Sequence, residues 1–241
     1  NDGGTSYFHK SVGGYHAAKM SRYQELIENG LDGEISGFIS TLQNSDGNMS
    51  VINEAMQGNS ILNMLNTRYI IYNPSAPALP NPYANGNAWF VDNIEWVGSA
   101  REEMDKLLQT NTKETAVIHQ TFKKQVTTNH LAVDSSRSVL LLSYAPNMLE
   151  YQYKSDKDAV LVFSEIYYNK GWKAYIDNKE VPYMRANYVL RALAVPAGDH
   201  SIRFAFEPET YYKGEKIALF GSITMVLLVL AALVAPLRKR L

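Results

Sequence analysis

Two groups of residues in this sequence have side chains suited to contacting a phosphate or a sugar. The first lies near the N-terminus, where His9, Lys10 and His16 flank the Gly13-Gly14 pair. Cationic donors beside a flexible backbone suit phosphate or sugar oxygens, although the rest of a Walker or dinucleotide motif is absent. These three residues are candidates for ligand contact, and the alternative is that the histidines are ordinary surface or capping residues.

The second group consists of aromatic rings interleaved with polar and cationic side chains between residues 167 and 191. Its candidate ligand-facing residues are Trp172, Lys173, Arg185, Asn187 and Arg191. Exposed aromatic faces beside amide and guanidinium donors would form a sugar-binding surface. Aromatic residues at strand spacing are also typical of sandwich packing, which would place Lys173 and Arg191 on an outer face. The exposure of the rings separates these two interpretations.

No catalytic residue can be named from spacing. The histidines lack metal-ligand spacing, no GxSxG occurs, and the acidic pairs Glu102/Glu103 and Asp156/Asp158 look like solvated helix faces or turns. Cysteine is absent, which excludes disulfides and thiolate chemistry. The formal net charge of −1 gives no reason to expect nucleic acid as a partner. We expect no cofactor and no metal.

The elements that must position these residues fall into a mixed first part and a strand-rich second part. Helices are predicted over 16–29, 33–42, 48–65 and 99–108, and strands over 69–72 and 88–97. Gly30 is predicted to stop the first helix, and Ser99 with Glu102 has the spacing of a capping box. The proline-rich segment 73–87 is predicted to be a long exposed loop.

Short strands dominate after residue 137, and they predict an antiparallel β-sandwich. Two hairpins are predicted, one turning at Asp177-Asn178 and one at Pro196 to Asp199. The expected fold class is α+β. Its expected parts are a mixed α/β region over 1–124, a β-sandwich domain over 125–212, and a transmembrane helix with a basic tail over 213–241.

The run from Ile217 to Ala235 contains no charged residue and is long enough to span a bilayer as a helix. Arg238, Lys239 and Arg240 crowd its far end, so the positive-inside tendency predicts a cytoplasmic C-terminus and an extracytoplasmic chain before Lys216. The chain starts with Asn1 and shows no signal peptide, so we expect it to be the end of a longer membrane protein.

Several motifs resemble one family of bacterial membrane proteins. GWKAYIDNKEV and VPAGDHSIRFAFEP, together with SYFHKSVGGYHAAKMSRYQELIE and NPYANGNAWFVDNIEWV, resemble the YfhO family. The resemblance implies a GT-C-like glycosyltransferase with many membrane helices and a lipid-phosphate-linked sugar donor. The multi-span part and its acidic catalytic loop are missing from this sequence, so no catalytic residue is carried over.

We therefore expect the extracytoplasmic C-terminal region and last membrane helix of a YfhO-like glycosyltransferase, itself non-catalytic, in the cell membrane or the inner membrane of a Gram-negative cell. The implied partners are the lipid bilayer, the missing N-terminal membrane part, a polyprenyl-phosphate sugar and an envelope glycan. The alternatives are a non-enzymatic carbohydrate-binding or envelope-assembly module and a purely structural ectodomain.

Overall fold

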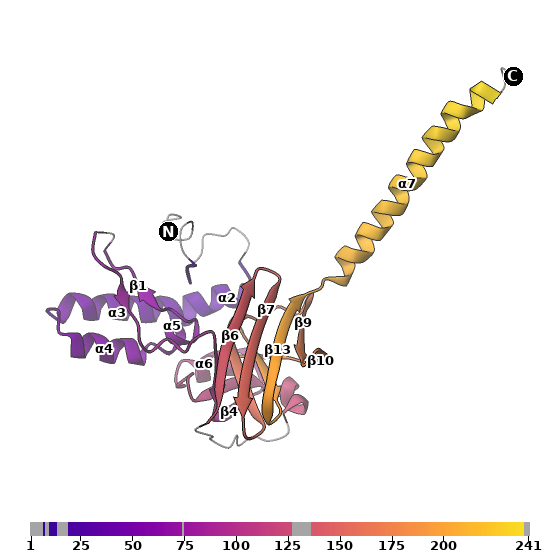
Figure 1. Cartoon of the computed structure of the whole chain (residues 1–241). Coiled ribbons are helices and arrows are strands. Elements are labelled where there is room, and N and C mark those ends of the chain that lie inside the picture. The colour runs from indigo at the N-terminus through magenta and orange to yellow at the C-terminus, as the bar shows by residue number, and fades with distance from the viewer. Residues whose placement is uncertain (1–6, 8–9, 14–18, 74, 127–135, 239–241) are drawn as a thin grey trace.

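The computed structural model describes residues 7, 10–13, 19–73, 75–126 and 136–238. A group of helices lies beside two packed β-sheets, and the helix α7 projects away from them (Figure 1). The fold is therefore α+β, with mixed helix and strand in the first part and one apolar helix at the end, as predicted.

The first helices form one continuous rod instead of two separate helices. The rod consists of α2 (Ser21–Leu26), the π-helical η1 (Ile27–Leu31) and α3 (Asp32–Asn44). The prediction that Gly30 stops a helix was wrong, because Gly30 lies inside η1. A Cβ atom there would lie 2.3 Å from Ile61 Cδ1, so the glycine permits close packing of another helix against the rod.

The predicted helical stretch 48–65 is confirmed as α4 (Met49–Gly58) and α5 (Ser60–Met64). The short strands β1 (Tyr69–Ile70) and β2 (Leu79–Pro80) follow and pair antiparallel. The prediction of a wholly exposed loop over 73–87 was partly wrong, because β2 lies in it and Asn81 is buried. The Asn81 amide donates to Asn63 Oδ1 at 2.8 Å, so this part of the segment is held against α5.

The five-stranded sheet is antiparallel throughout. Its strands in spatial order are β10 (Lys179–Val181), β9 (Trp172–Ile176), β13 (Gly198–Phe206), β7 (Met148–Ser155) and β6 (Ser138–Ala145). The hairpin predicted at Asp177-Asn178 is confirmed between β9 and β10. Both turn residues have positive φ, 47° and 67°, which is the backbone of a two-residue type I′ turn.

The six-stranded sheet takes strands from both halves of the chain. Its spatial order is β3 (Ala88–Val91), β8 (Ala159–Ile166), β12 (Leu190–Val195), β11 (Met184–Ala186), β5 (Thr115–His119) and β4 (Asn93–Val97). Only the β4–β5 pairing is parallel, because α6 (Ala100–Leu107) connects the two strands as a crossover. The 3₁₀ helix η2 (Gln120–Gln125) follows β5. Strands from both sides of residue 124 thus share one sheet, and the division into domains there stays a prediction.

The second predicted hairpin was wrong. β12 belongs to the six-stranded sheet and β13 to the five-stranded sheet, so the segment around Pro196 carries the chain from one sheet to the other. Gly198 has a φ of 133°, a conformation that favours glycine, and Asp158 Oδ1 accepts a hydrogen bond from Ala197 N at 3.0 Å. Local turn chemistry is the same for a hairpin and for this crossing, so the sequence pattern did not separate them.

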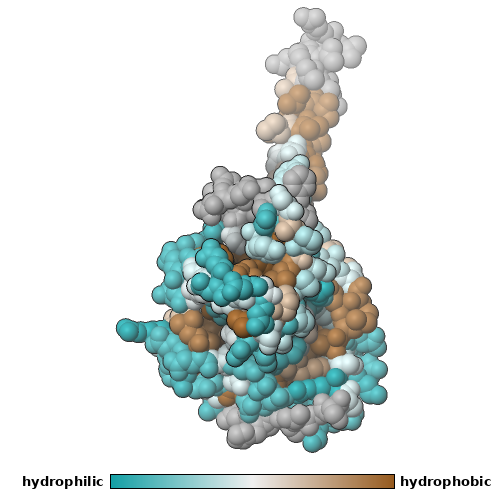
Figure 2. Space-filling view, turned by 90° about the vertical axis from the view of Figure 1, so that its left-hand side faces the viewer, coloured by the Kyte–Doolittle hydropathy of each residue, from teal (hydrophilic) through white to brown (hydrophobic). Residues whose placement is uncertain are grey.

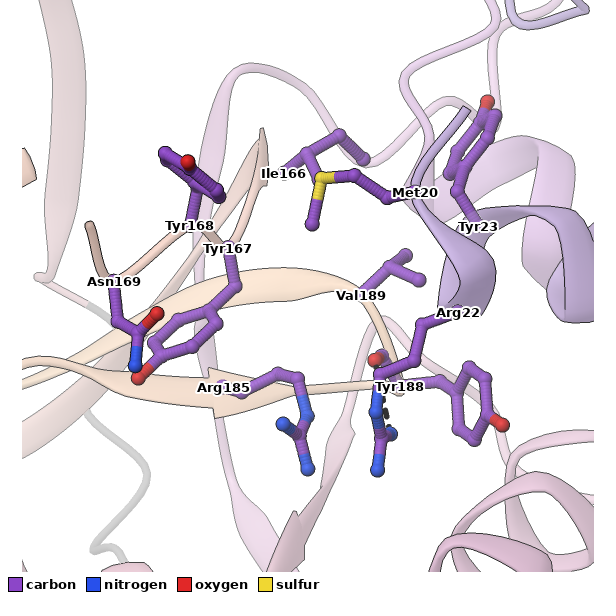
Figure 3. A pocket seen from close by; sticks show the side chains of 10 residues that line it. All are labelled: Met20, Arg22, Tyr23, Ile166, Tyr167, Tyr168, Asn169, Arg185, Tyr188 and Val189. Carbon is purple, nitrogen blue, oxygen red and sulfur yellow. Dashed lines mark hydrogen bonds between the residues drawn. The ribbon is translucent and has the colours of Figure 1, made fainter. Parts of the chain in front are cut away.

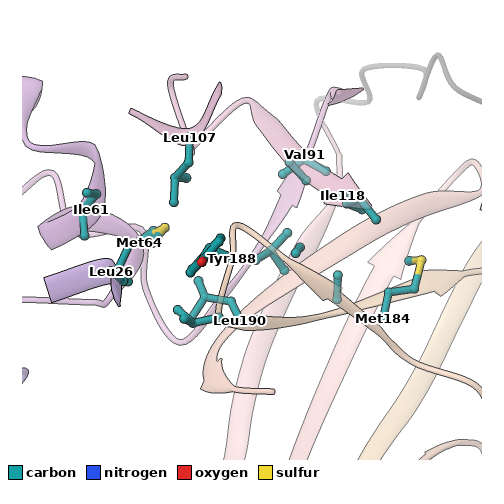
Figure 4. Close-up of a cluster of buried hydrophobic side chains, with 14 of the residues drawn as sticks. Leu26, Ile61, Met64, Val91, Leu107, Ile118, Met184, Tyr188 and Leu190 are labelled. Carbon is teal, nitrogen blue, oxygen red and sulfur yellow. The ribbon is translucent and has the colours of Figure 1, made fainter. Parts of the chain in front are cut away.

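The molecule has three layers because the six-stranded sheet is covered on both faces. Between the two sheets lies an aromatic core in which the Tyr151 and Phe163 ring centroids are 5.0 Å apart, and so are those of Phe163 and Phe204. A second core joins the other face of the six-stranded sheet to the helices (Figure 4), and its members include Leu26, Met64, Ile118, Tyr188 and Leu190. A smaller cluster of Phe38, Ile52 and Met56 joins α3 to α4.

Candidate functional site

A pocket of about 210 Å³ lies where the start of α2 meets the six-stranded sheet. Its walls come from the first turn of α2, the segment after β8 and the turn between β11 and β12 (Figure 3). The lining residues are Met20, Arg22, Tyr23, Ile166, Tyr167, Tyr168, Asn169, Arg185, Tyr188 and Val189. The pocket therefore depends on segments that are distant in sequence.

Two arginines in this pocket share one buried carboxylate. Arg22 Nη1 lies 2.9 Å and Arg185 Nη2 lies 3.4 Å from Glu103 Oε2, and the Glu103 side chain is 0% exposed. A second carboxylate, that of Glu25, accepts a hydrogen bond from the Tyr188 hydroxyl on the same wall, so the two guanidinium groups face two carboxylates. Arg185 Nε is buried and makes no hydrogen bond within the described part of the chain. The wall thus has two guanidinium groups and one N–H donor without a partner, which are the groups that an anion would contact.

Glu103 is held in place by the start of α6 and by the β11–β12 turn. The Ser99 hydroxyl accepts from Glu102 N at 3.2 Å, which confirms the Ser99 half of the predicted capping box four residues before Glu103. The Glu102 carboxylate accepts from Gly98 N at 2.7 Å, one residue before the cap. The second oxygen, Glu103 Oε1, accepts from Tyr188 N at 3.2 Å. Tyr188 has a φ of 69°, so its amide is presented by a tight left-handed turn. The carboxylate therefore fixes the two arginines relative to this turn.

Three tyrosines around the pocket stay neutral over the physiological pH range because their pKa values are raised. Burial raises the pKa of Tyr188 to about 12 and that of Tyr23 to about 12. Burial also raises the pKa of Tyr167, whose ring is 5.9 Å from the Arg185 guanidinium carbon. Tyr168 is 41% exposed at the rim. The Tyr23 hydroxyl already donates to Val12 O at 2.5 Å, and the Tyr188 hydroxyl donates to Glu25 Oε2. The guanidinium groups are therefore the donors that the pocket offers, and the tyrosine rings offer faces for stacking.

The pocket lies at the end of the sandwich from which the apolar helix departs. The segment after Tyr168 leads to Gly171 and Trp172, which lie beside the end of β13. The Gly171 carbonyl accepts from Glu207 N at 2.6 Å, and Trp172 pairs with Phe206. The helix α7 (Glu209–Arg238) begins two residues after Glu207. In its described part, Glu209–Ala232 is long and apolar enough to cross a membrane, and it is not covered by the rest of the molecule. Figure 2 shows this helix projecting beyond the body.

Residues 101–218 match the family model for the bacterial membrane protein YfhO. This region belongs to the YfhO family. No curated protein and no solved structure matches the chain. The matched region runs from α6 into α7 and includes Glu103, Arg185 and the tyrosines after β8, whereas Arg22 lies before it. Membrane localisation follows from the family and from the apolar helix.

The candidate residues near the N-terminus lie outside the pocket or outside the described residues. His9 and His16 are not among the described residues. Lys10 is exposed, and its Nζ atom lies 3.3 Å from the centre of the Tyr144 ring on β6. A ligand role for these three residues stays a prediction.

Of the later candidates, Arg185 lines the pocket and the other four do not. Lys173 lies on the outer face of β9, 3.6 Å from Glu180 and 3.8 Å from Glu207. Asn187 is 0% exposed, and its Oδ1 accepts from Val117 N at 2.9 Å. Asn187 therefore holds the β11–β12 turn against β5.

The expectation that Arg191 lies on an outer face was wrong. Arg191 is 3% exposed, and its guanidinium carbon lies 4.1 Å from the Trp172 ring centre. Its Nε donates to Ile166 O at 3.1 Å, and burial lowers its pKa. Arg191 is enclosed because β12 lies in a sheet that is covered on both faces. The aromatic rings are correspondingly mostly packed, with Tyr168 as the exposed exception within 167–188.

Sequence reasoning missed Arg22, Glu103 and Tyr188 as members of one site. The interpretation of Glu103 as a solvated residue was wrong, since it is fully buried. A signal was present, because Glu103 lies four residues before Leu107 and next to Met104, on the apolar face of its helix. A carboxylate on such a face needs a buried cation as partner. Which cations would meet it depends on contacts distant in sequence.

Proposed function

We propose that this chain is the extracytoplasmic C-terminal part, with the last membrane helix, of a longer YfhO-family protein that transfers a sugar from a lipid-phosphate carrier to envelope polymers. In this proposal the chain performs no chemistry. The pocket beside α2, which we call the arginine pocket, binds the phosphate-bearing end of the lipid carrier and positions it for the membrane part of the protein.

The observation that carries the proposal is the pair of arginines on one carboxylate at the membrane-proximal end of the sandwich. The wall has two guanidinium groups and a buried donor, Arg185 Nε, that has no partner among the described residues. Guanidinium groups suit phosphate oxygens because their donors form a planar fork. The neighbouring tyrosines would contact the sugar.

The position of the pocket relative to the bilayer also supports the proposal. The polar residues from Glu209 to Lys216 precede the apolar run that starts at Ile217. At about 1.5 Å rise per residue they place the sandwich about 12 Å above the hydrocarbon, just beyond the headgroup layer. The basic residues after Pro236 favour a cytoplasmic C-terminus, and with that orientation the pocket would lie outside the cytoplasm.

The test is sugar transfer by the longer protein from a polyprenyl-phosphate hexose. Arg185→Gln should raise KM for the donor about tenfold with little change in kcat, because the residue binds the carrier and does not react. Arg203→Gln is the matched control, since this arginine stacks 4.1 Å from the Tyr175 ring on the outer face of β13. If the protein consumes no donor, or if both variants behave like the unchanged protein, the proposal fails.

A non-enzymatic glycan-binding or assembly module is the second candidate function. The exposed Tyr168 ring beside Asn169 favours it, because this rim alone could contact a sugar. It would be supported by glycan binding that persists when the longer protein shows no transfer.

A further inference from the structure

A second cavity lies beside α4 and the β1–β2 pair, and it shares no lining residue with the arginine pocket. It is an open groove of about 500 Å³ between α4, the segment that leads into β1, and the segment that follows β2. Neither the candidate residues from the sequence nor the proposed function involves it. The family match also begins after it, since all its lining residues precede residue 101.

One wall of this groove carries a fixed set of hydrogen-bond donors. Arg68 Nε donates to Asn66 Oδ1 at 3.2 Å and Arg68 Nη2 donates to Asn87 Oδ1 at 3.2 Å. Asn66 Nδ2 also donates to Asn87 Oδ1, at 2.9 Å, and Asn66 adopts a φ of 58°. The guanidinium is thus clamped by two amides, while its Nη1 makes no hydrogen bond to any residue that the structure describes. A donor fixed in this way loses little entropy when a ligand binds.

The other surfaces of the groove offer rings and a free amide. Tyr69 is 67% exposed and pairs with Pro80 across β1 and β2. The Asn53 side chain faces the groove from α4 and has no hydrogen-bond partner within the described chain. The groove thus combines an aromatic ring and proline faces with amide and guanidinium donors. That combination suits a sugar, which presents C–H faces and hydroxyl groups together.

The charge of the lining narrows the ligand class. Arg68 is the one ionised side chain among the described residues that line the groove, and no carboxylate lines it. A cationic ligand would therefore find no counter-charge. The groove is open to solvent, so it would leave much of an apolar ligand exposed, whereas small-molecule sites bury most of the ligand.

We infer that this groove, which we call the amide groove, binds a neutral oligosaccharide. Tyr69 stacks on a sugar ring, and Arg68 and Asn53 donate to its hydroxyl groups. The inference does not depend on the arginine pocket, because the two cavities share no lining residue.

The test uses the full chain in lipid nanodiscs and an array of neutral oligosaccharides built from hexoses and N-acetylhexosamines. Tyr69→Ala and Arg68→Gln should each weaken binding about tenfold, the effect of losing one stacking contact or one charged donor. Tyr72→Ala is the matched control, because this ring is 56% exposed and lies outside the lining. Bound sugar should also slow amide exchange at residues 66–69 and at Leu79 and Asn81.

Three results would overturn the inference: no binding to any oligosaccharide on the array, equal binding by Tyr69→Ala and Tyr72→Ala, or saturable binding of a proline-rich peptide in the groove in place of sugar. Tyr69 is a surface residue, so the Tyr69→Ala result stands even if Arg68→Gln fails to fold. Arg185→Gln should leave sugar binding to the amide groove unchanged, which separates this inference from the proposed function.

Discussion

At the scale of single residues, Glu103 has the largest expected effect on stability. Glu103→Ala would leave Arg22 and Arg185 close together without their shared carboxylate. Breaking a buried ion pair costs about 3–5 kcal/mol, and the low end applies here because both arginines are partly exposed. Denaturant unfolding of the full chain in detergent should show a loss of about 3 kcal/mol.

The control for Glu103→Ala is Asp105→Asn on the same helix. Asp105 is 63% exposed and 3.8 Å from Arg101, so its loss should change the unfolding free energy by less than about 1 kcal/mol. Equal effects of the two substitutions would contradict the buried carboxylate as the link between α2 and the sheet.

His200 and Asp177 give a second prediction at this scale, at the opposite end of the sandwich. His200 Nδ1 lies 2.5 Å from Asp177 Oδ2, and Nε2 lies 3.1 Å from Ala197 O. The Asp177 carboxylate, followed by the Ala197 carbonyl, raises the pKa of His200. The Ser201 amide, followed by His200, lowers the pKa of Asp177. The pair is therefore stabilising when His200 is charged and Asp177 is ionised.

The sign of the pH dependence follows from these directions. The contribution of His200 is complete below its ordinary pKa of about 6.5 and is lost as pH rises through the raised folded value. The contribution of Asp177 is present above its ordinary pKa of about 3.9 and is lost as pH falls through the lowered folded value. The destabilisation by His200→Gln, measured by denaturant unfolding, should shrink as pH rises from 6 to 9. A difference that does not vary with pH would show that the pair is not charged.

At the scale of elements, the close approach of α5 to the rod depends on a glycine. Gly30→Ala places Cβ 2.3 Å from Ile61 Cδ1 and 3.1 Å from Leu108 Cδ2, so the packing of α5 on the rod must shift. Overpacking of this kind costs about 1–3 kcal/mol. Gly37→Ala has nothing within 4 Å and should instead stabilise α3 by about 0.5–1 kcal/mol. The midpoints of thermal unfolding of the two variants test these opposite expectations. A higher midpoint for Gly30→Ala would contradict the close approach of Ile61 to Gly30.

The elements also show how much of the fold the sequence could predict. The turn at Asp177-Asn178 was predictable because its geometry is set by the two residues themselves. The crossing at Gly198 was not, because its sheet partners are distant in sequence. The same division applies to the candidate site. Arg185 was found as a cationic residue among aromatics, whereas its link to Arg22 through Glu103 depends on the packing of α2 and α6.

At the scale of the whole molecule, three layers end in one apolar helix. The matched YfhO-family region contains the five-stranded sheet, four strands of the six-stranded sheet, and the start of α7. The helices and β3–β4 add the remaining walls, including Arg22 for the arginine pocket. The pocket therefore exists only when both parts of the chain are folded together. Separate expression of residues 125–212 would lack Arg22 and Glu103 and should not bind the carrier.

The most direct test of the proposed function is carrier binding by the full chain. Native mass spectrometry from nanodiscs that contain a polyprenyl phosphate would measure the dissociation constant for the unchanged chain, Arg22→Gln, Arg185→Gln and Arg203→Gln. We predict about tenfold weaker binding for each of the first two variants, the effect of losing one charge-assisted hydrogen bond, and unchanged binding for Arg203→Gln. Equal affinity of all four proteins, or no binding by the unchanged chain, would contradict a carrier site in the arginine pocket.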